Sequence, residues 1–147
     1  YRKQNPKIIK LWDQLDEALR FFVQRDEDVG EILTPNGKPI KYFDLSEKDG
    51  DLVAAVTKGE KTKRLFGGLL VENLVQATAR EIFADALLRL EAMGLPVCLH
   101  VHDSVTVEVA ESEGDAALSA LVQVLSEPPA WAKGLPLAAE GEIKGHY

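Results

Sequence analysis

The opening stretch of the chain alternates apolar and polar residues at helical spacing. Asn5-Pro6 is typical of a helix start, with Asn5 as N-cap and Pro6 at the first helical position. The apolar residues that follow recur three or four positions apart and predict one buried stripe. They are Ile8, Ile9, Leu11, Trp12, Leu15, Ala18, Leu19, Phe22 and Val23. We expect this helix to end around residues 25–30, where charges cluster.

A β-rich stretch follows. Two short apolar segments, residues 31–33 and 38–43, flank the sequence Thr34-Pro35-Asn36-Gly37. Asn-Gly between two such segments is a strong hairpin signal. Residues 51–56 and 62–66 are expected to form two more short strands, with the lysine-rich residues 58–63 as an exposed turn.

A long helix is predicted over residues 69–93, closed by Gly94. Its expected buried stripe consists of Val71, Leu74, Val75, Thr78, Ile82, Ala86 and Leu90. Glu72, Gln76 and Arg80 lie four residues apart, so they share a different face of the helix, with Asn73 beside them.

The last third of the chain predicts a second hairpin. Residues 96–101 and 105–109 read as strands, and His102-Asp103-Ser104 lies at the tight turn between them. A helix over residues 112–125, with Ser112 as N-cap, and a final strand over 135–143 complete the prediction. The fold class is therefore α+β, a small antiparallel sheet with helices packed on one face. Residues 1–147 are expected to form one domain without an internal boundary.

Composition and charge narrow the function classes. The chain is 46% hydrophobic, enough for a core without disulfides, and Cys98 is its single cysteine, as expected for a cytoplasmic protein. No apolar run is long enough for a membrane span. The net charge of −7 argues against a free-standing nucleic-acid binder. It leaves open an acidic, metal-binding part of a larger nucleic-acid enzyme, and the absence of an initiator Met suggests such a piece.

Asp103 is the main candidate for chemistry. A carboxylate at the tip of an apolar hairpin can project to where a hard cation such as Mg²⁺ reaches it. Two such ions about 4 Å apart assist phosphoryl transfer. A plain alternative is an Asp that satisfies the amides of its own turn. A zinc site that uses His100 and His102 is a third interpretation, but no further ligand follows at a recognised spacing.

Two polar patches are candidates for nucleic-acid contact. The helix face of Glu72, Asn73, Gln76 and Arg80 carries amides, which suit the acceptors of the minor groove; a solvated helix face is the alternative. A basic run could contact phosphates or simply form a solvated loop. It consists of Lys58, Lys61, Lys63 and Arg64.

Taken together, these segments resemble the end of family A DNA polymerases of the bacterial polymerase I type, closest to the phage and prophage branch. Residues 67–81, which run Gly-Gly-Leu-Leu-Val-Glu-Asn-Leu-Val-Gln-Ala-Thr-Ala-Arg-Glu, carry the resemblance together with Val97-Cys98-Leu99-His100-Val101-His102-Asp103. Residues 1–19 and 129–137 add to it. The resemblance implies the C-terminal part of the polymerase palm.

The resemblance also implies roles by position. Asp103 would bind the catalytic Mg²⁺ ions, and His102 would lie near the 3′ end of the primer. Gln76, together with Glu72, Asn73 and Arg80, would contact the DNA. Ser104 stands where the family usually has Glu, which implies weaker metal binding.

The implied reaction is attack of the primer 3′ hydroxyl on the α-phosphate of a deoxynucleoside triphosphate, directed by a template strand. Its partners would be primer-template DNA, the triphosphate, and the upstream fingers, thumb and remaining palm. The family's second aspartate would precede Tyr1, so the isolated chain is predicted to be inactive. Two alternatives are an inert prophage remnant that keeps the palm core, and a metal-dependent hydrolase that uses His100, His102 and Asp103.

Overall fold

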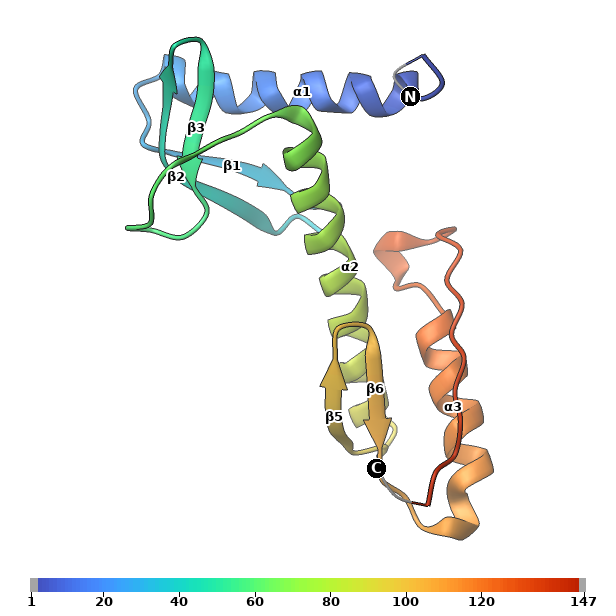
Figure 1. Ribbon diagram of the computed structural model, residues 1–147. Coiled ribbons are helices and arrows are strands. Elements are labelled where there is room, and N and C mark those ends of the chain that lie inside the picture. Colours follow the sequence, from blue (N-terminus) through green and yellow to red (C-terminus); the bar gives the residue numbers. More distant parts are fainter. Residues whose placement is uncertain (1–2, 146–147) are drawn as a thin grey trace. The chain divides into compact units, whose positions relative to one another are not determined.

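The computed structural model describes residues 3–145, so Tyr1 and Arg2, which open the segment 1–19, lie outside it. Within that part the chain forms three α-helices, two 3₁₀ turns and six strands (Figure 1). The α+β class is confirmed. Contacts divide the chain into a first compact unit that ends at Thr78 and a second that begins at Ala79. The single domain stays a prediction, because helix α2, Gly67–Ala92, continues through both units.

Helix α1, Pro6–Gln24, forms as predicted. Asn5 occupies the N-cap position with proline in the first turn, and its backbone carbonyl accepts hydrogen bonds from the amides of Ile8 and Ile9 at 3.1 and 3.2 Å. Leu15 and Leu19 are the buried residues of this helix. Most of the predicted apolar stripe therefore faces the core of the first unit, but Ala18 is exposed, so its place in the stripe was wrong.

The first unit contains a four-stranded antiparallel sheet in the order β1-β2-β3-β4. Its strands are β1 Val29–Leu33, β2 Pro39–Lys48, β3 Asp51–Ala55 and β4 Lys63–Arg64. The hairpin at Asn36-Gly37 is confirmed. Gly37 has a φ of +79°, which a residue without a side chain adopts at little cost, and its amide donates to the Thr34 carbonyl at 2.8 Å.

A second hairpin in this sheet was not predicted. Strand β2 continues to Lys48, and the chain turns at Asp49-Gly50, where φ is 52° and 83°. Positive φ at both turn residues is typical of a type I′ turn, for which Asp-Gly is a preferred pair. The signal was thus present in the sequence. Strand β3 confirms the segment 51–56 apart from its last residue, whereas β4 is only two residues long.

The core of the first unit lies between this sheet, α1 and the start of α2. Its buried members are Leu15, Leu19, Ile32, Tyr42, Leu45, Leu52, Ala54, Leu65 and Leu70. Gly67 lies against α1, since a Cβ there would clash with the Trp12 side chain and lie 2.9 Å from the Trp12 Cα. Only glycine allows this approach of the two helices.

Helix α2 was predicted over 69–93 and occupies Gly67–Ala92, with Gly94 just beyond at a φ of +77°. Ala86 and Leu90 are buried as predicted, but Val75 is 59% exposed, so its place in the buried stripe was wrong. The reason is that α2 contributes to two cores. Leu70 belongs to the first and Ala86 and Leu90 to the second, so one straight stripe does not describe the helix.

The second unit combines a hairpin with the later half of α2 and with α3. The strands are β5 Val97–Val101 and β6 Ser104–Val107, and α3 spans Gly114–Ser126 after a 3₁₀ turn at Glu111–Glu113 (Figure 1). Arg89 of α2 donates to the carbonyls of Val124 and Glu127 at 3.2 and 2.8 Å. Its guanidinium thus ties α2 to the C-terminal end of α3, where the Val124 carbonyl also accepts from the Glu127 amide at 3.4 Å.

Two predictions for the second unit were wrong. Ser112 lies within the 3₁₀ turn, and the N-cap position of α3 belongs to Glu113. Residues 135–143 form no strand. This segment lies along α3 instead, where the Ala139 amide donates to the Ser126 Oγ at 3.1 Å and Gly141 approaches Leu118. A strand needs a neighbouring strand edge, and a helix offers none.

No helix in residues 3–145 has the length and apolar character needed to cross a membrane.

Candidate functional site

Two helices, α2 and α3, pack against one side of the hairpin that carries Asp103. Its inward-facing residues are Val97, Val105 and Val107, and they pack against a small core. That core consists of Ala86 and Leu90 from α2 and Leu121 and Val124 from α3. A two-stranded hairpin is marginally stable alone, so this packing is what holds its turn in place.

Polar and aromatic contacts add to the anchoring. The Val97 amide donates to Glu91 Oε1 at 2.8 Å, which ties the start of β5 to the end of α2. The ring of His100 meets Phe83 of α2 edge-on, with centroids 6.1 Å apart. His100 is therefore engaged with the helix.

The turn itself has two residues, His102 and Asp103, because Val101 pairs directly with Ser104. His102 has a φ of 55°, a left-handed conformation that residues other than glycine seldom adopt. The Ser104 Oγ donates to the Val101 carbonyl at 2.8 Å and closes the turn. Such strain persists only where the surroundings determine the backbone, which the two pairing strands do here.

Asp103 lies at the tip of the hairpin and is exposed, as predicted. Among the described residues its carboxylate has no hydrogen bond or ion pair with any other side chain, so both oxygens face solvent. The plain alternative, an Asp that satisfies its own turn, receives no support, because Ser104 closes the turn. A carboxylate with free oxygens fits Mg²⁺, which prefers oxygen ligands and keeps several waters.

Asp103 is nevertheless a single ligand. Within residues 3–145 no three side chains of His, Cys, Asp or Glu gather closely enough to hold a metal ion. His100 contacts Phe83, and His102 has left the strand at the turn. The geometry therefore gives no support to the zinc interpretation or to a hydrolase built on His100, His102 and Asp103.

The predicted polar face of α2 is present in part. Glu72 and Gln76 are exposed, and Gln76 Nε2 donates to Glu72 Oε1 at 3.3 Å across one helical turn. Both lie in the first unit. Arg80, one turn further along, is also exposed and belongs to the second unit.

Asn73 differs from its neighbours because it contacts the core of the first unit. Its Nδ2 donates to the hydroxyl of Tyr42 at 3.1 Å, and Tyr42 is fully buried. Burial raises the pKa of Tyr42, since the anion would lose its hydration. Sequence reasoning missed Tyr42, because its partner is 31 residues away and no local pattern joins them.

The basic run lies at the end of the first sheet. Lys58, Lys61 and Lys63 are exposed, while Arg64 forms an ion pair with Asp51 at 2.9 Å. Three of its four cations are thus directed to solvent without an acidic partner among the described residues.

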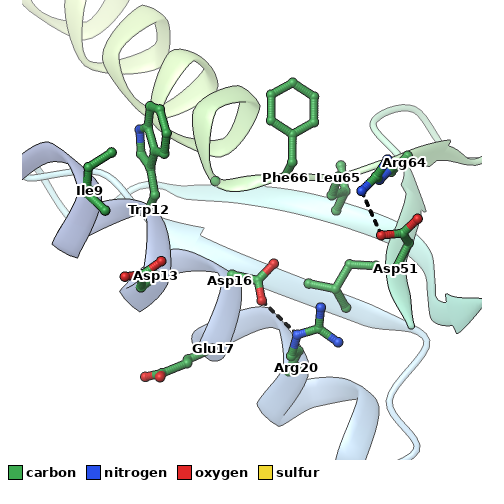
Figure 2. A pocket seen from close by; sticks show the side chains of 12 residues that line it. Ile9, Trp12, Asp13, Asp16, Glu17, Arg20, Asp51, Arg64, Leu65 and Phe66 are labelled. Atoms are coloured by element: carbon green, nitrogen blue, oxygen red, sulfur yellow. Dashed lines mark hydrogen bonds and ion pairs between the residues drawn. The ribbon is translucent and has the colours of Figure 1, made fainter. Parts of the chain in front are cut away.

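The first unit contains a hollow of about 430 Å³ formed by α1, β3 and the segment that leads into α2. Figure 2 shows the side chains that line it. Its charged groups are largely paired with one another. Arg20 bonds to Asp16 at 2.7 Å, which raises the pKa of its guanidinium, and Arg64 meets Asp51. A hollow with its cations already paired has little to offer an anionic ligand.

The second unit thus presents one free carboxylate on a rigid hairpin, an arrangement that can donate a metal ligand to a site completed by other residues. Over its whole length the chain is 31% identical to a DNA polymerase from Bacillus phage SP02. The chain spans 26% of that relative's length. No protein-family model and no solved structure matches the chain.

Proposed function

We propose that the chain is the C-terminal part of the palm of a family A DNA polymerase and serves template-directed DNA synthesis. The observation that carries the proposal is the likeness to a DNA polymerase along all of the chain. The free carboxylate of Asp103 at a fixed hairpin tip supports it, because a polymerase of this kind needs a carboxylate that binds metal.

In this proposal Asp103 binds the catalytic Mg²⁺ ions and sets their place relative to the hairpin. Bound Mg²⁺ would activate the primer hydroxyl and stabilise the leaving oxygen. His102, next to Asp103 in the turn, lies near the primer end. The contribution of the chain is position, because the helices below the hairpin hold the carboxylate without reorganisation during the reaction.

The helix face supplies contacts with the duplex. The amide of Gln76 suits the minor-groove acceptors, which look alike for every correct base pair. Its bond to Glu72 is long and exposed, so DNA can replace it at small cost. Arg80 would contact the phosphate backbone. Asn73 supports this face of the helix from the core side, through its hydrogen bond to the Tyr42 hydroxyl.

The decisive experiment is single-turnover nucleotide incorporation by the full-length parent enzyme at saturating Mg²⁺. Asp103→Asn keeps the size of the side chain but removes the charge that holds the metal. We expect a loss of about a thousandfold, equivalent to ~4 kcal/mol. Asp49→Asn is the matched control, since Asp49 is also exposed at a hairpin turn; it should leave the rate unchanged.

Two further variants rank the contributions of neighbouring residues to the incorporation rate. Ser104→Ala should matter much less than Asp103→Asn, because it deletes no charge, and Gln76→Ala should fall between them. Retention of more than about a tenth of the rate by Asp103→Asn, a loss below ~1.4 kcal/mol, would refute the role of Asp103.

Ser104 favours a second candidate, a palm that keeps its core without activity. The family usually has Glu there, and here the hydroxyl is used to close the turn. Under this alternative the full-length protein binds primer-template DNA but incorporates no nucleotide, even at high Mg²⁺. Synthesis by the wild-type parent would exclude it.

A further inference from the structure

The loop that joins β3 to β4 is a basic segment in an acidic chain. Residues 57–64, which we call the basic loop, hold four cations and one carboxylate, in a chain whose net charge is −7. The loop turns at Gly59, which has a φ of 87°, and the Glu60 amide donates to the Thr57 carbonyl at 3.1 Å. Its backbone is thus ordered, while its lysines extend outward.

The cations of the basic loop differ in their partners. Arg64 is neutralised by Asp51. Lys58, Lys61 and Lys63 are exposed, and none forms an ion pair with another described residue. In an acidic protein, three neighbouring ammonium groups without an ion pair give a polyanion local attraction instead of repulsion.

A structural explanation exists for one of these lysines. Strand β4 is the edge of the sheet, and charged residues on an edge strand prevent other chains from pairing with it. Lys63 lies on that strand and fits this role. Lys58 and Lys61 precede the strand, so they protect no position of the ladder and remain unexplained.

We propose that the basic loop is a contact site for the phosphate backbone of duplex DNA. The choice of DNA rests on the proposed function, since a polymerase palm works next to its own product duplex. Three lysine side chains that are not held by partners suit phosphates, which carry no sequence information. Binding of these lysines to DNA phosphates releases the counterions of the DNA. The contact is therefore independent of sequence and strongly dependent on salt.

The test uses the 147-residue chain and a fluorescent duplex of about 20 base pairs, over a series of salt concentrations. The variant Lys58→Ala/Lys61→Ala/Lys63→Ala should reduce the slope of log K against log salt by up to about 2.7, at ~0.9 per phosphate contact. At the lowest salt its affinity should fall at least ~tenfold, the order expected from three lost contacts. The matched control removes the same charge from exposed positions on or next to strand β2 of the same sheet, as Lys38→Ala/Lys41→Ala/Lys48→Ala. It should change the slope by less than a third as much.

Each other outcome overturns the proposal. Equal effects of the two triple variants would show that net charge alone governs binding. Tighter binding of poly-glutamate than of the DNA duplex at equal charge concentration and equal salt would indicate an acidic protein partner. Unchanged DNA affinity with new aggregation of the loop variant would assign all three lysines to edge protection. Circular dichroism checks that both variants keep the fold.

Failure of this site and failure of the polymerase proposal are separable. The binding assay needs no synthesis, and Asp103→Asn should leave the effect of the three lysines intact. One combination of results would separate them: loss of DNA binding in the loop variant together with full activity of Asp103→Asn in the parent. It would support the basic loop as a DNA contact site and refute the proposal that the chain is part of a polymerase palm.

Discussion

The hydrogen bond between Asn73 and Tyr42 decides what each residue can do. A buried hydroxyl costs free energy unless it has a partner, and Asn73 is the partner that the structure gives it. Asn73 is thereby committed to the core of the first unit. Gln76, one turn further on, is left on the outer face, where its amide remains accessible.

Tyr42 should make the stability of the first unit sensitive to alkaline pH. Burial raises its pKa above the ordinary 10.0, so the folded state holds the proton more tightly than the unfolded state. Its contribution is complete below about pH 10 and is lost as pH rises through the higher folded value. Urea unfolding between pH 8 and 11 should show a decline that Tyr42→Phe reduces.

Asn73→Ala is the comparison for this prediction. It leaves the hydroxyl buried without its partner, so it should destabilise the chain by about 1–3 kcal/mol at pH 7. It retains the ionisable group, and the alkaline decline should persist. An identical pH profile for Tyr42→Phe and the wild type would show that the pKa of Tyr42 does not differ between the folded and unfolded states.

Among the elements, the crossing of α1 and α2 depends on Gly67. Gly67→Ala would place a Cβ against the Trp12 backbone, which cannot move aside as a flexible side chain can. Overpacking of this kind costs about 1–3 kcal/mol. Gly68→Ala is the matched control, since its closest neighbour is the exposed ring of Phe66 at 3.2 Å.

Thermal unfolding of the two alanine variants measures this difference. Gly67→Ala should melt several degrees below the wild type, and Gly68→Ala should stay close to it, because alanine favours the helix. Equal melting temperatures for both variants would mean that α1 and α2 can move apart at Gly67 without loss of stability.

Elements with local signals were predictable from the sequence. Asn36-Gly37 defines its hairpin, and the apolar stripe of α1 defines its buried face. Asp103 at a hairpin tip followed from two apolar strands with a polar turn between them. Each of these features depends on residues that are close neighbours in the chain.

Elements that depend on distant partners were not predictable. Val75 fits a helical stripe, but α2 changes cores along its length, so that position faces solvent. Residues 135–143 alternate like a strand, yet they pack against α3 and meet no sheet edge. The commitment of Asn73 to Tyr42 joins positions 31 residues apart, and a polar residue on a helix gives no hint of such a partner.

For the molecule as a whole, net charge and the capacity to bind metal limit what the chain can do alone. A net charge of −7 opposes the phosphate backbone, so the chain should bind DNA weakly and without sequence preference. A single carboxylate such as Asp103 would not hold two metal ions in a productive arrangement, and no three His, Cys, Asp or Glu side chains gather closely enough to bind metal among residues 3–145.

The chain alone should therefore extend no primer. A primer-extension assay with the purified chain, Mg²⁺ and all four deoxynucleoside triphosphates should give only unextended primer at any protein concentration. The DNA polymerase of Bacillus phage SP02 serves as the positive control. Template-dependent extension by the 147-residue chain would contradict the proposal that Asp103 needs metal ligands from other residues.

The continuity of helix α2 through the unit boundary has a consequence for the order of folding. Starting a helix is unfavourable, whereas adding residues to an existing one is not. Because the boundary at Thr78 and Ala79 falls inside α2, this nucleation cost arises once for both units. Whichever unit folds first offers the other a helix end that is already formed. The unit that folds later can therefore form its part of α2 by adding residues to that end.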